Sequence, residues 1–312
     1  MNHRKPVTYK KQSLGKVLRR YKYLYLMVAI PLVYYAVFRY APLMGLQVAF
    51  KDYNLFKGMW DSPWVGFKVF REIFSYKKFW RALRNTALLN IYDLLFGFSV
   101  PIILAILLYE MRSLRLKRLS QTLLYLPHFL SWVIIGGIVT ELFSSTGMVN
   151  QLIKRLSGGT VDFLTDPGRW TVVYVATGIW QSAGWSTIIY LAAISSVDTA
   201  LYEAAEVDGC GRWKRIWYVT LPCIMPTITV MLILQLGRVA TIGFERPYVM
   251  GNYMVTDVSD VISTFVYTMG IRNARYPFAT AVDLFGSLLN LVFLVAANVI
   301  TKRLNSGEGG LW

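Results

Sequence analysis

The sequence is poor in the residues from which disulfide frameworks and metal sites are built. Its 312 residues include two cysteines and two histidines. Cys210 and Cys223 lack the spacing of a metal site, and His3 and His128 add no cluster to them. We therefore expect no disulfide framework and no metal centre, and we interpret both cysteines as small apolar fillers.

Charged residues are scarce as well. They make up 16% of the chain, below the roughly 25% that is usual in soluble domains, whereas hydrophobic residues make up 55%. The mean hydropathy is +0.43. Length alone would suggest two soluble domains, but the long apolar stretches favour a polytopic membrane protein.

Acidic residues are outnumbered by basic ones, 17 to 33, and the formal net charge is +16. No acid occurs in residues 1–22, which carry eight lysines and arginines. Clustered cations bind the phosphates of nucleic acids. Here most of them lie between apolar stretches or in the N-terminal tail, which is typical of the cytoplasmic side of a membrane protein that meets anionic lipid. No nucleic-acid partner is expected.

Six apolar stretches reach the roughly 20 residues that a membrane span needs. The first follows the basic tail without a small-residue cleavage site and is interpreted as an uncleaved span. The sequence has no internal repeat with a period of 20–50 residues, so it is not a solenoid protein. We expect an all-α polytopic membrane protein, with a basic tail at 1–21, a transmembrane domain at 22–303 and a short tail at 304–312. The six predicted spans are 22–42, 86–109, 121–143, 170–196, 218–243 and 279–301.

The basic N-terminal tail also sets the expected orientation, because positive charge close to the spans stays on the cytoplasmic side. Both termini and the loops 110–120 and 197–217 are then inside. In the first outside loop, residues 67–86 carry apolar side chains at helical spacing. They are expected to form an amphipathic helix on the outer membrane surface that leads into the second span. The loops expected outside are 43–85, 144–169 and 244–278.

The second inside loop contains a compact polar stretch, "LYEAAEVDGCGRWKRIWYVTLPCIMP", residues 201–226. Asp198 can cap a helix on which Ala204 and Ala205 offer a small apolar surface, and Gly209 can then break that helix. Such a short helix is marginal in water, so we expect it to dock on another surface. An ordinary interfacial helix and a DNA-reading helix-turn-helix are alternatives, although spans on both sides would crowd a duplex.

This loop resembles the EAA loop of permease subunits of binding-protein-dependent ABC importers. The family pattern E-A-A-x3-G-x9-I-x-L-P is met by Glu203-Ala204-Ala205, Gly209 and Leu221-Pro222, with Val219 in place of isoleucine. The stretches "PLMGLQVAFKDYN" (42–54) and "FWRALRNT" (79–86) resemble the carbohydrate-uptake branch, which includes maltose-type and LplB-like permeases. The resemblance covers about residues 20–303.

The resemblance implies a type I ABC importer permease fold whose EAA loop is a coupling helix seated in a cleft of a separate ATPase subunit. Glu203 would pair there with a basic group, the two alanines would fit the groove, and Gly209 would let the chain turn. Leu221 and Pro222 would join the loop to the fifth span. The coupling residues implied in this way are Glu203, Ala204, Ala205, Asp208, Gly209, Leu221 and Pro222.

The resemblance also implies the partners and the location. They are a second homologous permease subunit, two ATPase subunits and an extracellular solute-binding protein, assembled at a bacterial cell membrane. No G-x-x-x-x-G-K-[ST] phosphate loop occurs in the sequence. ATP and magnesium would therefore bind to the ATPase subunits, and neither a cofactor nor a catalytic residue is expected in this chain.

Polar residues inside the predicted spans are candidates for the substrate pathway, because such groups usually face a cavity or another helix. Contact between helices or anchoring at the interface is the simpler explanation for each residue taken alone, and both interpretations stay open. For Arg238, Glu245 and Arg246 the alternatives are an outer gate or docking rim and a plain surface ion pair. The pathway candidates are Asn90, Asp93, Gln181, Trp185, Gln235, Asp283 and Asn290.

The predicted function is that of an importer permease which forms half of the pathway for a carbohydrate, with an oligosaccharide favoured and another polar solute as the alternative. An enzyme would need convergent nucleophile, base or metal residues, which the sequence does not show. An ion channel would need a filter-like glycine-rich repeat or a charged ring, and neither is evident.

Overall fold

The computed structural model describes residues 19–304, and the regular elements in this range are helices. A single isolated bridge joins Lys51 and Trp64. Most of both predicted tails, 1–18 and 305–312, lies outside the described residues. The α-helices are α2 (Lys22–Tyr35), α3 (Gly58–Asp61), α4 (Lys68–Ser75), α5 (Lys77–Tyr92), α6 (Ser99–Glu110), α7 (Leu114–Tyr125), α8 (Trp132–Phe143), α9 (Met148–Ser157), α10 (Pro167–Ser195), α11 (Thr199–Val207), α12 (Arg212–Arg215), α13 (Leu221–Leu236), α14 (Glu245–Met250), α15 (Thr256–Ser259), α16 (Ile262–Tyr267) and α17 (Tyr276–Leu304).

Short 3-10 and π segments join several of these helices into longer rods. They are η1 (Ala36–Tyr40), η2 (Ala41–Phe50), η3 (Asp93–Gly97), η4 (Leu126–Phe129), η5 (Ile216–Thr220), η6 (Tyr253–Val255) and η7 (Thr268–Arg272). Within the described range, five helical stretches are long and apolar enough to cross a membrane: Lys22–Phe50, Lys77–Glu110, Trp132–Ser157, in which a short turn separates α8 from α9, Arg212–Leu236 and Tyr276–Arg303. A sixth is α10 together with α11, which a bend of 69° separates. The all-helical membrane fold is thus confirmed.

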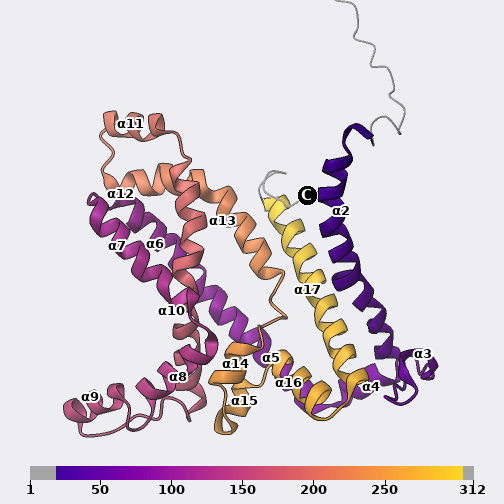
Figure 1. Cartoon of the computed structure of the whole chain (residues 1–312). Helices are drawn as coiled ribbons and strands as arrows, with labels where there is room; N and C mark the ends of the chain where they lie inside the picture. The colour runs from indigo at the N-terminus through magenta and orange to yellow at the C-terminus, as the bar shows by residue number, and fades with distance from the viewer. Residues whose placement is uncertain (1–18, 305–312) are drawn as a thin grey trace, which may run out of the picture.

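The loops alternate between the two ends of the molecule (Figure 1). α11 and α12 lie at one end, together with the connection between α6 and α7, the start of α2 and the end of α17. α3, α4, α9 and α15 lie at the opposite end. We call these the α11 end and the α9 end. The loops expected inside therefore share one end of the structure, and the loops expected outside share the other.

Two predicted elements differ from the structure. The predicted span 121–143 is interrupted: α7 ends at Tyr125, a 3-10 turn containing Pro127 follows, and α8 starts only after Ser131, whose side chain caps it. Proline lacks the N–H that a continuing helix needs, so an apolar run can still contain a break.

The predicted amphipathic helix 67–86 is divided into α4 and α5 at Tyr76, where the backbone is extended. It leads into the second span as predicted, but its apolar side chains have two kinds of surroundings, and Phe67 and Phe74 are exposed. Val69 and Ile73 are buried in a cluster with Phe79 and Phe278. The periodicity shows which face of a helix is apolar, but it does not show whether lipid or protein covers that face.

α10 is the central helix of the bundle, and its small residues allow close packing. α6 packs along it, and α7 with η4 crosses it. A Cβ on Gly184 would lie 1.9 Å from the carbonyl oxygen of Leu124, so only glycine fits at this crossing. The cluster of Tyr190, Ile194 and Ile224 then joins α10 to α13 near the α11 end.

The candidate coupling loop and transmembrane cavity

The polar loop forms the helix–break–helix that its sequence predicts. Asp198 caps α11 by accepting a hydrogen bond from the backbone N–H of Ala200 at 2.9 Å. Gly209 has a φ of +73°, in the left-handed region that favours glycine, and the N–H of Cys210 returns to the carbonyl of Ala205 at 2.9 Å. Gly209 therefore ends α11 and turns the chain toward α12.

The two alanines of the EAA pattern face different surroundings. Ala205 is buried against the body of the protein, whereas Ala204 is exposed together with Glu203 and Asp208. Val207 is 89% exposed. α11 projects from the α11 end of the molecule (Figure 1), and its exposed residues are acidic and apolar.

The loop continues into the fifth span without a break in the helix. Helical backbone runs from Arg212 through η5 and α13 to Leu236. Leu221 packs on the cluster at the α10–α13 contact, while Pro222 is exposed in the first turn of α13. The π segment η5 ends at Thr220, two residues before this proline, so the widened turn lies where the missing N–H of Pro222 removes a helical hydrogen bond. Because α12, η5 and α13 form one rod, a displacement of the loop also displaces this span.

A cavity of about 1290 Å³ lies between the spans, and four of the predicted pathway residues line it. They are Asn90, Asp93, Gln181 and Gln235. Its other lining residues include Trp132, Ser182, Ser186, Arg238, Thr241, Glu245 and Arg246. Amides, hydroxyls and charged groups are thus combined here with the face of an aromatic ring.

The other three predicted pathway residues lie elsewhere. Trp185 stacks on His128, with ring centroids 4.6 Å apart and planes 6° from parallel. Asp283 lies on the exposed surface of α17. Asn290 accepts a hydrogen bond from the N–H of Ala240 at 2.9 Å and also contacts Thr241. It therefore stabilises the segment that follows α13.

Asn90 has a similar structural contact although it lines the cavity. Its amide donates to the carbonyl oxygens of Val239 and Thr241, at 2.8 and 3.3 Å. α13 ends at Leu236, seven residues before the predicted end of the fifth span. Asn90 and Asn290 therefore hydrogen-bond to backbone that has left the helix.

Arg246 has a role that the sequence did not reveal. Its guanidinium donates to both carboxylate oxygens of Asp93, at 2.6 and 3.2 Å, and to the carbonyl of Tyr174 at 2.6 Å. It also lies 3.7 Å from the centroid of the Tyr174 ring. The side chains of Arg246 and Asp93 are only 12% and 23% exposed, so the interpretation of Arg246 as part of a plain surface ion pair is wrong.

Space for this guanidinium comes from a glycine on the central helix. A Cβ on Gly178 would lie 2.3 to 2.6 Å from the guanidinium atoms of Arg246. α14 thus inserts one cation between the second span and α10. The contact joins residues 153 positions apart in the sequence, which no local pattern could predict.

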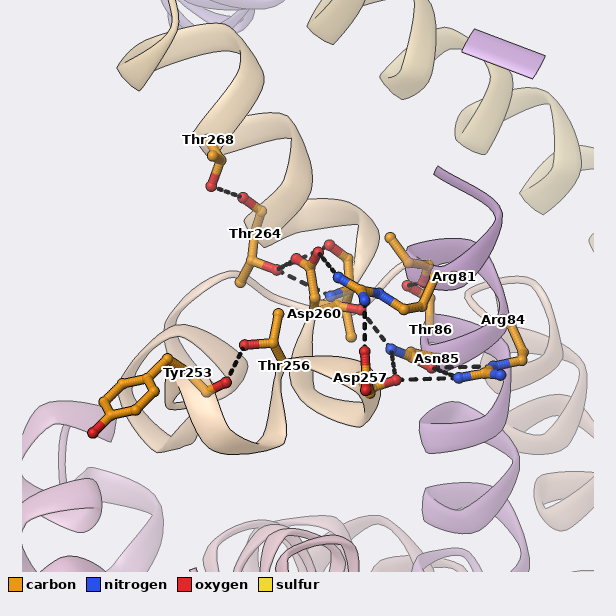
Figure 2. Close-up of polar contacts among 12 residues, drawn as sticks. Arg81, Arg84, Asn85, Thr86, Tyr253, Thr256, Asp257, Asp260, Thr264 and Thr268 are labelled. Atoms are coloured by element: carbon orange, nitrogen blue, oxygen red, sulfur yellow. Dashed lines mark hydrogen bonds and ion pairs between the residues drawn. The ribbon is translucent and has the colours of Figure 1, made fainter. Parts of the chain in front are cut away.

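A second polar cluster fastens the segment that follows α14 to the outer end of α5 (Figure 2). Arg81 pairs with Asp257 at 2.5 Å. The amide of Asn85 donates to the carbonyls of Asp257 and Asp260, both at 2.9 Å. The hydroxyl of Thr86 accepts from the N–H of Ile262 at 2.9 Å. We call residues 244–262, which comprise α14 and the residues that follow it, the outer segment, after the side on which the sequence predicts them.

Burial has an electrostatic consequence in this cluster. Asp260 lies among protein groups that replace water, and this desolvation raises the pKa of its carboxyl above the ordinary value. A hydrogen bond from Thr264 and the charge of Arg81 oppose the rise. Arg81 thus pairs with two carboxylates of the outer segment: the exposed Asp257 and, at 3.9 Å, the largely buried Asp260.

The all-helical bundle, the polar cavity and the projecting loop together define a polytopic membrane transport protein. The chain belongs to the family of binding-protein-dependent transport system inner membrane components, which matches residues 97–306. It is thus a transporter permease and not an enzyme. The predicted family and fold are confirmed.

Two relatives from Bacillus subtilis (strain 168) match almost the whole chain. The chain is 44% identical over 287 residues to protein LplB, covering 92% of this chain and 90% of the relative. It is 40% identical over 304 residues to the polygalacturonan/rhamnogalacturonan transport system permease protein YteP, covering 97% and 94%.

Two solved structures share the fold. One is a bacterial ABC transporter involved in the import of the acidic polysaccharide alginate, with a TM-score of 0.86, 40% identity, and coverage of 94% of this chain and 99% of that chain. The other is the bacterial alginate ABC transporter in complex with an alginate pentasaccharide-bound periplasmic protein, with a TM-score of 0.87, 39% identity, and coverage of 96% and 100%.

Proposed function

We propose that this chain forms half of the translocation pathway of an ATP-driven importer that takes up an oligosaccharide delivered by an extracellular solute-binding protein. The observation that carries the proposal is the exposed α11, joined by the turn at Gly209 to the helical rod Arg212–Leu236, which is the fifth span and lines the cavity. A second homologous permease and two ATPase subunits complete the assembly. The family match and the alginate transporter structures support this arrangement.

ATP hydrolysis is assigned to the separate ATPase subunits, which also bind the nucleotide and magnesium. The absence of a phosphate-binding loop from the sequence supports this assignment. Glu203 is proposed to pair with a basic group in the ATPase cleft, and Ala204 to sit against the cleft wall. Ala205 instead holds α11 on its own chain, because its side chain is buried. Asp208 and Gly209 end the helix, and Leu221 with Pro222 passes its tilt to α13.

The cavity chemistry and the relatives together support an oligosaccharide cargo. A sugar ring has apolar patches and a rim of hydroxyls, which suit an aromatic face flanked by amides and carboxylates. Trp132 with Gln181 and Gln235 provides this combination. YteP is named for polygalacturonan and rhamnogalacturonan transport, and the two solved structures for alginate. These are saccharides, whereas the sequence alone left another polar solute open.

The orientation follows from the charges of the basic tail. Eight uncompensated cations in residues 1–22 place the α11 end in the cytoplasm, so both termini are cytoplasmic. The outer segment and α9 then face the binding protein. The location is the cell membrane of a bacterium.

Reconstitution of the full complex in vesicles tests the proposal. A panel of acidic and neutral oligosaccharides, each with the binding protein, is assayed for stimulation of ATP hydrolysis and for uptake. We expect stimulation by at least one oligosaccharide, and loss of the ATPase subunits from the purified complex after Glu203→Lys. Solute flux without ATP would indicate a channel. Stimulation only by a solute that is not a saccharide would refute the cargo assignment.

A further inference from the structure

The loop at the α11 end has a second attachment to the transmembrane region besides its continuation into α13. Arg212, the first residue of α12, forms an ion pair with Glu110, the last residue of α6. Its guanidinium also donates to the backbone carbonyl of Glu110 at 2.5 Å. The Glu110 side chain is 19% exposed, and that of Arg212 is 51% exposed. An ion pair that shares one guanidinium with a backbone carbonyl has a defined geometry, unlike a mobile surface pair.

Polar contacts, not close packing, join the loop to α6 at this point. A cavity of about 510 Å³ lies between them, lined by Glu110, Arg212, Cys210 and their neighbours. Beside it, the rings of Tyr202 on α11 and Tyr109 on α6 are 6.0 Å apart. The Glu110–Arg212 pair is therefore the charged contact between α12 and α6, beside the ring contact of Tyr109 and Tyr202.

α6 belongs to a helical stretch that reaches the opposite end of the molecule. α5, η3 and α6 are continuous from Lys77 to Glu110, 34 residues, or about 50 Å at the helical rise. The π segment η3 lies in the middle of it and begins at Asp93. π segments inside long helices are frequent at functional sites.

The same stretch binds the outer segment at two further levels. In the middle, Asp93 holds Arg246 at the start of α14. At the outer end, Asn85 and Thr86 hold the backbone near Asp257 and Ile262 (Figure 2). One helical rod is therefore joined by polar contacts to the loop at the α11 end, to the cavity and to the outer segment.

We propose that Glu110 and Arg212 form a second coupling joint, through which the rod Lys77–Glu110 carries movement of the coupling loop to the cavity and the outer segment. Glu110 and Arg212 are positioning residues, which act through the rod and not by contact with cargo or nucleotide. The inference rests on the proposed function, because it requires the loop to be driven by an ATPase. It adds a route that is independent of the covalent path through α13.

The test measures opening of the cavity directly. Ser186, which lines the cavity, is replaced by cysteine in a chain whose Cys210 and Cys223 are alanine. The complete complex is reconstituted in vesicles, and labelling of this chain by a membrane-impermeant maleimide from the outer side is timed with and without ATP and vanadate. The variants are Glu110→Gln, Arg212→Gln and the charge exchange Glu110→Arg with Arg212→Glu. Arg215→Gln is the matched control. It removes the same charge one turn further along the chain, and Arg215 pairs with Glu206 of the loop itself and not with α6.

We expect the ATP-dependent increase in the labelling rate to be smaller by about fivefold or more in each single variant. A factor of this size is typical when the coupling between two allosteric sites is lost. The charge exchange should recover at least about half of the rise, and Arg215→Gln should leave it unchanged. A full rise in both single variants would overturn the inference, as would loss of the ATPase subunits from them, since the pair would then serve assembly. Absence of the rise in the parent chain would instead refute the proposed function.

Discussion

The contact between Arg246 and Asp93 makes a quantitative prediction about stability. Arg246→Gln removes the counter-ion of a carboxylate that is 23% exposed, together with a donor to Tyr174 and a cation above its ring. Loss of one partner from such a pair leaves an uncompensated charge and costs about 3 kcal/mol or more. Asp93→Asn should cost a similar amount, because it leaves the guanidinium unpaired.

The double variant Asp93→Asn, Arg246→Gln should be less destabilised than either single variant, because two neutral amides replace the ion pair. The assay is thermal unfolding of the detergent-solubilised complex followed by tryptophan fluorescence, with a fall in Tm of about 6 °C or more expected for each single variant. Arg238→Gln is the control, because Arg238 lines the same cavity but is exposed. Additive losses in the double variant would show that the pair carries no coupling energy and would refute the reasoning.

Four further predictions concern the fold and its attachments. Gly184→Val should abolish the yield of monodisperse protein, because the added Cβ would lie 1.9 Å from a carbonyl oxygen, whereas Gly137→Val, with open space around it, should not. Gly209→Ala should strain the φ of +73° by about 1 kcal/mol and weaken the permease–ATPase complex about fivefold in a dissociation assay. Asn85→Ala removes two hydrogen bonds to the outer segment, costs about 2 kcal/mol, and should speed its cleavage by external protease. The pKa of Asp260 is raised in the folded chain above its unfolded value of about 3.9. Between these two pKa values the folded chain binds more protons than the unfolded chain, so the contribution of Asp260 to stability falls as the pH rises through this window. Asp260→Asn should remove this part of the dependence of Tm on pH.

Apolar runs and local signals predicted much of the architecture. The long helices appear where hydropathy indicates them, because a bilayer selects for length and apolar composition. The coupling loop was also predictable: a cap at Asp198 and a left-handed turn at Gly209 act within a few residues of each other. Such features depend on local backbone chemistry, which a sequence displays directly.

The features that were missed depend on what surrounds each residue. Hydropathy did not detect the break at Pro127, because both sides of the break are apolar. Asp283, a carboxyl in a span, is exposed on α17 and does not line the cavity, so its place in the pathway stays a prediction. Arg246 approaches the cavity only because Gly178 leaves space for it on another helix. These relations arise from tertiary packing.

α2 differs from the other long helices in the support that it receives. None of its residues is buried, and Ile30 and Leu32 are more than 60% exposed. Its position across the bilayer therefore depends on partition of its own side chains into lipid and on η2, further along the same stretch, which packs on α17. A helix of this kind can insert as soon as it has been synthesised, before the residues of the later spans exist. α2 thus supplies an orientation to which every following loop of the protein is added in turn.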